Sequence, residues 1–257
     1  MVGPVVTVDF HNTLIECDEW FHLEVRTLVS AVLDWASEHA GAAEQLINRQ
    51  IVDDEYRRLR LAIHSHGHEL EAERAVAVVL DRVGISLAQD VIAAAVHELM
   101  HATLRFAQPV AGARQFLQEL HQQNARIAVV SSAVYHQFLE WALESFSMLN
   151  HVDTVITSAS CGFYKSRPEI YWAALAALDT ASHEAAHVGD SLRFDVGGAS
   201  AAGMKTVWYN RAPSTNGGTQ EFIPDLIVTD LESASEQVLA LTRANAQAPV
   251  AIAKGNH

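Results

Sequence analysis

Residues 4–14 read PVVTVDFHNTL, a short run of mostly β-branched residues that stops at an aspartate. A run of this kind, without regular alternation of polar and apolar residues, is typical of a central parallel strand buried on both faces. Residues 4–8 are therefore predicted to form a buried strand, with Asp9 at its carboxyl end. Ligands of open α/β sheets bind beyond the carboxyl ends of the strands, so Asp9 is a candidate functional residue.

Similar runs recur along the rest of the chain. They lie at residues 126–130, 152–157, 185–188, 205–209 and 225–228. Apolar residues at helical spacing occur between them, at residues 112–122, 135–143, 169–178 and 194–202. Strands that alternate with helices predict an α/β fold with a Rossmann-like, doubly wound parallel sheet. Ser131 and Asp190 follow two of these strands, which places them near Asp9 at one edge of the sheet.

The segment between the first two predicted strands is unusually long. No run within it predicts a strand, and helical patterns cover residues 21–39, 42–63, 69–83 and 87–106. Such a length exceeds what a simple crossover between parallel strands needs. We expect an all-helical cap domain at residues 18–107, inserted into a core of residues 1–17 and 108–243, and a flexible tail at residues 244–257.

The composition limits the classes of function. Hydrophobic residues make up 49% and charged residues 19%, as in globular proteins. The formal charge of −14, from 17 basic and 31 acidic residues, argues against binding to nucleic acid or anionic membranes. We expect a cytoplasmic protein for three reasons. The chain has only two cysteines, its start carries no basic leader, and no apolar run reaches the roughly 18 residues that a membrane helix needs. The sequence does not predict an oligomeric state.

Four short motifs carry the candidate chemistry. They are DFHNTL at residues 9–14, the strand that ends at Ser131, GFYKSRP at residues 162–168, and GDSLRFD at residues 189–195. In this order, with a helical insertion after the first motif, they resemble the haloacid dehalogenase superfamily, whose members are mostly phosphatases. The resemblance covers about residues 4–232. It implies Mg²⁺ as cofactor and a covalent intermediate on Asp9.

The residue types of these motifs suit phosphoryl transfer. A phosphate monoester is a dianion, so attack by a carboxylate requires a nearby cation, and Mg²⁺ held by carboxylate oxygens supplies one. We expect Asp9 to be both nucleophile and metal ligand, with the His11 backbone carbonyl, Asp190 and Asp195 as further ligands. The groups expected to bind the phosphoryl oxygens are Ser131, Ser132 and Lys165. The expected reaction is hydrolysis of a small, anionic, phosphorylated metabolite.

His11 departs from the pattern that the resemblance implies. Phosphatases of this superfamily usually carry a second aspartate two residues after the nucleophile, as general acid for the leaving alcohol. A protonated imidazole can also protonate a leaving group, so we expect His11 to be the catalytic acid. Dehalogenases carry an aromatic residue there, which leaves a 2-haloacid dehalogenase-type hydrolase as an alternative. A non-catalytic binding protein of the same fold is a third hypothesis.

Two histidine patterns are interpreted as lying outside the chemistry. His97 and His101 match the H-E-x-x-H pattern of zinc proteases, but no suitably spaced third ligand follows. His64, His66 and His68 form a local cluster, interpreted as an exposed loop. The alternative for this cluster is a loop that faces the active site.

Overall fold

Six parallel strands form the large sheet of the computed structural model, which describes residues 3–40, 48–211 and 222–243. The strands are β1 (Val5–Asp9), β4 (Arg126–Ser131), β5 (Thr154–Thr157), β6 (Ala185–Gly189), β7 (Lys205–Tyr209) and β8 (Leu226–Val228). Their order is β5-β4-β1-β6-β7-β8, and each neighbouring pair is parallel. The predicted α/β fold with a doubly wound parallel sheet is confirmed.

Strand β1 lies at the point where the chain changes direction across the sheet. From β1 the chain moves to β4 and β5 on one side, and then returns to β6 on the other. The connections on the two sides therefore diverge near the carboxyl end of β1. Such a switch point leaves a crevice in which ligands of doubly wound sheets bind.

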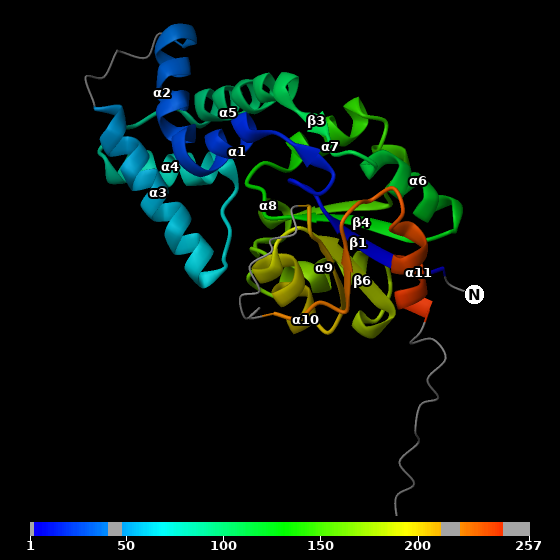
Figure 1. Cartoon of the computed structure of the whole chain (residues 1–257). Coiled ribbons are helices and arrows are strands. Elements are labelled where there is room, and N and C mark those ends of the chain that lie inside the picture. The colour runs from blue at the N-terminus through cyan, green and yellow to red at the C-terminus, as the bar shows by residue number, and fades with distance from the viewer. Residues whose placement is uncertain (1–2, 41–47, 212–221, 244–257) are drawn as a thin grey trace, which may run out of the picture.

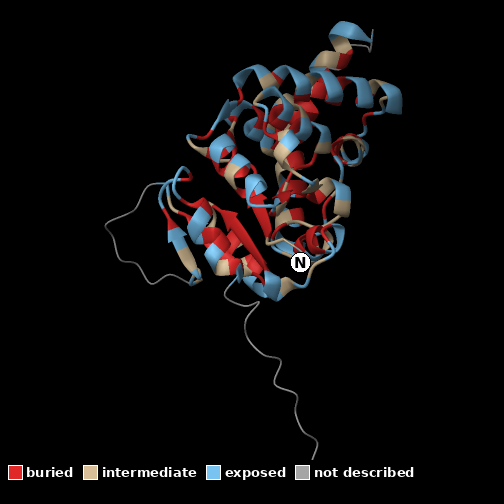
Figure 2. Ribbon diagram, turned by 90° about the vertical axis from the view of Figure 1, so that its right-hand side faces the viewer, coloured by how far each residue is buried: buried red, intermediate tan, exposed pale blue. Residues whose placement is uncertain are grey.

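Helices cover both faces of the sheet, so the central strands are buried (Figure 2). Helices α6 (Ala113–Gln122), α7 (His136–Ser145) and α11 (Ser235–Arg243) pack with Val6 and Val8 of β1 in one apolar cluster. Helices α9 (Glu169–Ala177) and α10 (Ala199–Ala201) pack with Val5 in another. Alternate residues of a strand point to opposite faces, which explains why β1 contributes to both clusters.

Helical elements occupy the long segment between β1 and β4, mostly to one side of the sheet (Figure 1). They are α1 (Asp18–His22), η1 (Leu23–Thr27), α2 (Leu28–His39), α3 (Arg49–His66), α4 (Ala72–Arg82), α5 (Gln89–Thr103) and η2 (Leu104–Phe106). The helix predicted at residues 21–39 is thus interrupted by a π-helical turn, η1. Part of the helix predicted at 42–63, and the tail predicted at 244–257, lie outside the described residues.

A small antiparallel ladder joins the two ends of this helical segment. Strand β2 (Ile15–Glu16) precedes the helices, β3 (Gln108–Pro109) follows them, and the two strands pair. The sequence did not predict these strands, because two residues carry no periodic signal. The ladder brings the entry and exit of the helical segment together beside the carboxyl end of β1.

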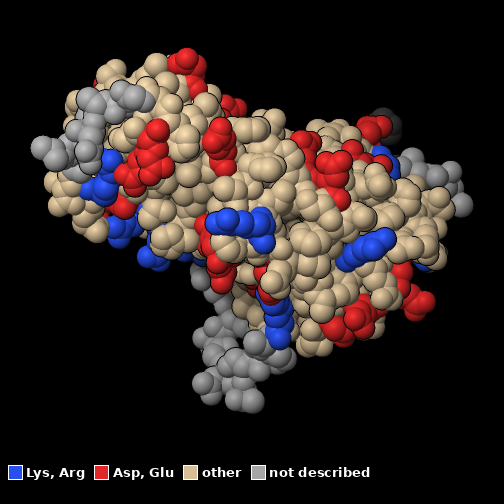
Figure 3. All heavy atoms as spheres, turned by 90° about the horizontal axis from the view of Figure 1, so that it is seen from above, with Lys and Arg blue, Asp and Glu red and all other residues tan. Residues whose placement is uncertain are grey.

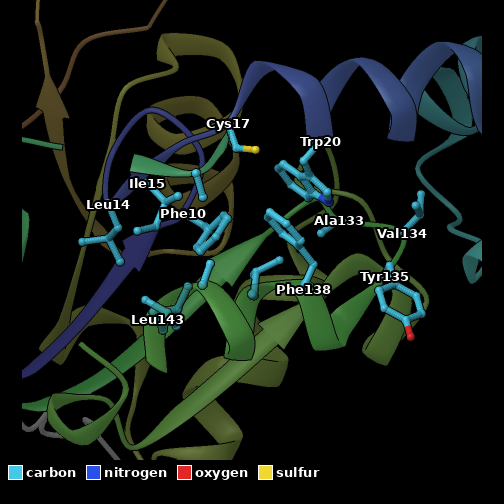
Figure 4. Close-up of a cluster of buried hydrophobic side chains, with 14 of the residues drawn as sticks. Phe10, Leu14, Ile15, Cys17, Trp20, Ala133, Val134, Tyr135, Phe138 and Leu143 are labelled. Carbon is cyan, nitrogen blue, oxygen red and sulfur yellow. The ribbon is translucent and has the colours of Figure 1, made fainter. Parts of the chain in front are cut away.

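An aromatic cluster packs the first helix of this segment against the rest of the molecule (Figure 4). The Trp20 ring of α1 stacks on Phe138 of α7, with ring centroids 4.7 Å apart and planes 3° apart. Phe10, just after β1, meets both rings edge-on, at 5.8 and 6.2 Å. All three side chains are fully or almost fully buried. The loop that follows Asp9 is thereby fixed between helices from two different parts of the chain.

The charges on one face of the molecule are dispersed. On the face in Figure 3, acidic and basic side chains are scattered among uncharged residues. Within residues 3–40, 48–211 and 222–243, no helix combines the length and the apolar character needed to cross a membrane.

Candidate active site

The carboxyl ends of β1, β4 and β6 bring three of the predicted site residues together. Asp9 ends β1, Ser131 ends β4, and Asp190 directly follows β6. Asp9 and Ser131 are only 6% and 3% exposed. Their polar groups therefore lie in a sheltered place, where electrostatic interactions are stronger than in bulk water.

Lys165 joins this group from the loop between α8 (Ser158–Cys161) and α9. Its ammonium group donates hydrogen bonds to Oδ1 of Asp9 and, at 2.6 Å, to Oδ1 of Asp195. Its backbone amide donates to Oγ of Ser132 at 3.0 Å. Burial alone would lower the pKa of Lys165, but Asp195 and Asp9 outweigh burial and hold that pKa above its usual range. The lysine therefore stays charged.

Three carboxylates crowd around this ammonium group. Oxygen atoms of Asp9, Asp190 and Asp195 all lie within 4.8 Å of one another. Burial raises the pKa of Asp9 to about 7 and that of Asp190 to about 6, and the charge of Asp195 adds to both shifts. Burial would also raise the pKa of Asp195, but Lys165 and His187 hold it well below its usual range. The site has more negative charge than one lysine neutralises, and its oxygen ligands suit a hard divalent cation.

The loop after β1 orients the Asp9 carboxylate. Asn12 adopts the left-handed conformation, with a φ of 65°, which asparagine tolerates better than most residues. The hydroxyl group of Thr13 donates a hydrogen bond to Oδ2 of Asp9 at 2.8 Å. Because Lys165 donates to Oδ1, both carboxylate oxygens of Asp9 have a fixed partner.

Close packing around Asp195 and Lys165 requires two glycines. A Cβ atom at Gly189 would lie 2.3 Å from Cγ of Asp195, and one at Gly198 would lie 2.4 Å from the backbone oxygen of Lys165. Both distances are far below van der Waals contact. The resulting approach allows Oδ2 of Asp195 to accept a hydrogen bond from the backbone amide of Ser191 at 2.8 Å.

His11 lies against helix α1. Its ring stacks on Phe21, with centroids 4.8 Å apart, and meets Trp20 edge-on at 5.6 Å. Burial lowers the pKa of His11, although Asp18 and Glu16 oppose the shift. The buried Nε2 atom has no hydrogen-bond partner among the described residues. An unpartnered buried polar atom is costly, so this nitrogen calls for an explanation.

The H-E-x-x-H pattern serves packing in this structure. The carboxylate of Glu98 accepts a hydrogen bond from Nε1 of Trp35 at 3.0 Å. The rings of His97 and His101 both meet Trp141 of α7 edge-on, at 5.1 and 5.0 Å. Within the described part of the chain, the group that offers three clustered metal-binding side chains is the aspartate cluster.

The cluster at residues 64–68 packs beside the loops that carry Lys165 and Asp195. The ring of His64 meets Tyr164 edge-on at 5.5 Å and Phe194 at 5.1 Å. These two aromatic residues directly precede Lys165 and Asp195 in the sequence. His64 and His66 lie in the last turn of α3, so this part of the cluster is helical and not the loop that the sequence indicated. The ring contacts of His64 place the end of α3 close to the loops that carry Lys165 and Asp195.

The sequence did not reveal three hydrogen-bonding residues of the site. These are Thr13, described above, and the pair formed by Thr7 of β1 and His187 of β6. His187 is linked to Oδ1 of Asp195 at 3.1 Å. Thr7 and His187 are polar residues in the middle of otherwise apolar strands, but this pattern alone does not assign them to the site.

Comparison with known proteins identifies the family. The family model described as "Haloacid dehalogenase-like hydrolase" matches residues 58–209. The chain is 35% identical over 101 residues to a ribulose-1,5-bisphosphate 5-phosphatase of Halopiger xanaduensis. The aligned region covers 39% of this chain and 42% of the relative. It is 34% identical over 119 residues to a phosphoserine phosphatase of Thermus thermophilus, covering 46% and 47%. The matched regions thus span less than half the length of either relative.

A solved structure supports the same fold. The 2-haloacid dehalogenase from Pseudomonas syringae superimposes with a TM-score of 0.69 at 21% identity, over 93% of this chain and 99% of that one. The parallel sheet, the motifs at its carboxyl edge and the family match agree. The chain belongs to the haloacid dehalogenase-like hydrolases.

Proposed function

We propose that this chain is a Mg²⁺-dependent phosphatase that forms a covalent intermediate on Asp9. The observation that carries the proposal is the buried arrangement in which Lys165 bridges Asp9 and Asp195 beside Asp190. A dehydrated carboxylate that is already held by a cation is suited to attack a phosphate dianion. The names of the two phosphatase relatives support this reaction class.

The donor set fits Mg²⁺. The carboxylates of Asp9, Asp190 and Asp195 would hold the ion together with the backbone carbonyl of His11. Their oxygen atoms lie close together. Burial raises the pKa values of Asp9 and Asp190, the negative charge of Asp195 adds to both shifts, and a bound divalent cation would favour the ionised carboxylates. When bound, the ion supplies Lewis-acid stabilisation of the phosphoryl oxygens and reduces charge repulsion.

The reaction has two steps, transfer of the phosphoryl group to Asp9 and hydrolysis of the resulting aspartyl phosphate. An oxygen of Asp9 forms a bond to phosphorus, and the bond from phosphorus to the substrate oxygen breaks. Water then attacks the phosphorus of the aspartyl phosphate, which releases inorganic phosphate and restores Asp9. Lys165 and the hydroxyl groups of Ser131 and Ser132 stabilise the phosphoryl oxygens.

We assign proton donation to His11. It lies two residues after Asp9, and its Nε2 atom is buried without a hydrogen-bond partner among the described residues. A substrate oxygen that leaves as an alkoxide needs a proton, and an imidazolium can supply it. Because burial lowers the pKa of His11, this donation should be favoured on the acidic side of neutral pH. In the second step the imidazole accepts a proton from the attacking water.

We further propose that residues 18–107 form a cap that covers the site. The β2–β3 ladder joins both ends of this segment, and Trp20 and His64 pack close to the catalytic loops. Closure of such a cap would exclude water during the first transfer and supply contacts to the substrate. The substrate is proposed to be a small phosphorylated metabolite.

The test is hydrolysis of p-nitrophenyl phosphate by the wild type and by Asp9→Asn, each with Mg²⁺ and with EDTA. Of the four samples, only the wild type with Mg²⁺ is expected to hydrolyse the ester, because the reaction needs both the nucleophile and the ion. Asp9→Asn is the matched control, since an amide of the same size cannot form the acyl phosphate. Turnover by Asp9→Asn, or in EDTA, would contradict the mechanism. Absence of turnover in all four samples would contradict phosphatase activity and make 2-haloacids the next compounds to assay.

A further inference from the structure

Thr7 and His187 form a polar pair in a layer that is otherwise apolar. They are register partners in neighbouring parallel strands, β1 and β6, and both are 0% exposed. Their surroundings include Val5, Ala185 and the ring of Tyr171, which meets His187 edge-on at 5.0 Å. Burying a hydroxyl group and an imidazole in such a layer costs free energy unless both are hydrogen-bonded.

The pair continues into the aspartate cluster. Oγ1 of Thr7 lies 2.7 Å from Nδ1 of His187, and Nε2 of His187 lies 3.1 Å from Oδ1 of Asp195. The same Oδ1 atom also accepts a hydrogen bond from Nζ of Lys165 at 2.6 Å. A continuous chain of hydrogen bonds thus runs from the interior of the sheet to the lysine that contacts Asp9.

The donors and acceptors in this chain fix the tautomer of the imidazole. An ionised carboxylate only accepts hydrogen bonds, so Nε2 of His187 must carry a proton to bind Asp195. In the neutral ring, Nδ1 is then an acceptor, and the hydroxyl group of Thr7 is its donor. Without that donor, the ring loses the contact that favours the Nε2–H form.

We propose that Thr7 and His187 are positioning residues that orient the Asp195 carboxylate for Mg²⁺ binding. The inference rests on the proposed function, in which Asp195 is a metal ligand. Oδ1 of Asp195 is held by His187 and Lys165, whereas Oδ2 accepts one described hydrogen bond, from the amide of Ser191. Since each carboxylate oxygen has two acceptor positions, Oδ2 has capacity for a metal ion. Hydrogen-bond partners of metal ligands commonly set ligand orientation in this way.

Thr7→Val and Thr7→Ser give a matched test, with Mg²⁺ affinity measured by titration calorimetry. Valine has nearly the shape of threonine but lacks the hydroxyl group, so we expect a loss of affinity of roughly 10- to 100-fold. Serine keeps the hydroxyl group and should bind Mg²⁺ close to the wild-type value. Wild-type affinity in folded Thr7→Val would overturn the proposal, and so would equal losses in both variants.

The tautomer provides a readout that depends on neither metal nor substrate. Nitrogen-15 NMR of the imidazole of His187 should show a proton on Nε2 and none on Nδ1 in the wild type, and a changed signal in Thr7→Val. A proton on Nδ1 in the wild type would overturn the proposal. His187→Gln, whose amide can donate to Asp195, should retain more Mg²⁺ affinity than His187→Leu.

The two proposals fail in different ways. A wild type that binds Mg²⁺ in calorimetry but hydrolyses no phosphate ester contradicts the phosphatase activity alone. A wild type that binds no Mg²⁺ contradicts both.

Discussion

At the scale of single residues, the role of His11 can be tested by comparing phosphate esters whose leaving groups differ in their need for a proton. His11→Ala should slow hydrolysis of an alkyl phosphate such as glycerol 2-phosphate by roughly 10²- to 10⁴-fold, because an alkoxide must be protonated as it leaves. The same variant should hydrolyse p-nitrophenyl phosphate at nearly the wild-type rate, since p-nitrophenolate leaves without a proton. The measurement is kcat/KM for both esters. His22→Ala, at an exposed histidine of α1, is the control. Equal slowing on both esters would mean that His11 is not the acid.

The same scale shows which site residues the sequence could predict. Asp9, Ser131 and Asp190 were predictable as neighbours, because the carboxyl ends of parallel strands meet at one edge of a sheet. The sequence also predicts Lys165 as the cation beside the nucleophile Asp9. It does not predict the second contact of Lys165, with Asp195, since a loop lysine has many possible positions. His187 was hidden because a single histidine in an apolar strand is indistinguishable from an ordinary core residue. Its register with Thr7 and its contact with Asp195 make it part of the site.

At the scale of elements, the turn η1 contains a buried glutamate, Glu24. Glu24 is 1% exposed, and its Oε2 atom has no hydrogen-bond partner among the described residues. The nearby guanidinium group of Arg60 donates to both oxygens of Glu69, at 2.6 and 3.1 Å. Burial raises the pKa of Glu24 to about 8; Arg60 opposes the shift and Glu69 adds to it. Glu24 therefore retains its proton at neutral pH in the folded protein.

This shift predicts how stability depends on pH. In the unfolded chain the pKa of Glu24 returns to about 4.5, so between about pH 4.5 and 8 the folded state binds more protons than the unfolded state. The free energy of unfolding should fall as pH rises through that window, by up to about 1.4 kcal/mol per pH unit from this group. Glu24→Gln, which is neutral at every pH, should lose less stability between pH 5 and 8 than the wild type. Urea unfolding at each pH measures the difference, with the exposed Glu19→Gln as control. Parallel curves for wild type and Glu24→Gln would contradict the raised pKa.

Elements differ in how strongly the sequence indicates them. The strands of the large sheet were predictable because short β-branched runs end at turn residues. The turns η1 and η5 (Leu192–Gly198) were predicted as ordinary helix, since a π-helical turn adds a residue to the turn without changing the apolar character of the segment. The pairing of β2 with β3 depends on the arrangement of the whole helical segment, so no local pattern reports it.

At the scale of the whole molecule, a seam of hydrogen bonds joins the proposed cap to the core. The backbone amide of Glu69 donates to the carbonyl oxygen of Gly162 at 2.9 Å, and the amide of Tyr164 donates to that of Gly67 at 2.9 Å. The hydroxyl group of Ser158 donates to Oε2 of Glu69 at 2.9 Å. The core side of this seam is the loop that carries Lys165. Movement of the proposed cap would therefore disturb the lysine that contacts the nucleophile.

Ser158→Ala should loosen this seam selectively. The variant removes one donor from Oε2 of Glu69, which keeps Arg60 as a partner, and it also removes the contact of this hydroxyl group with the carbonyl oxygen of Ala133. A hydrogen bond to a charged group contributes about 1.5–3 kcal/mol. We expect faster hydrogen exchange at the amides of Glu69 and Tyr164, because opening the seam becomes easier, while amides of β1 and β4 keep their protection. Ser145→Ala is the matched control, since that hydroxyl group bonds within its own helix, to the carbonyl of Trp141. Exchange that rises uniformly in the seam and in the central strands would indicate global destabilisation, and would contradict a cap that opens as a separate unit.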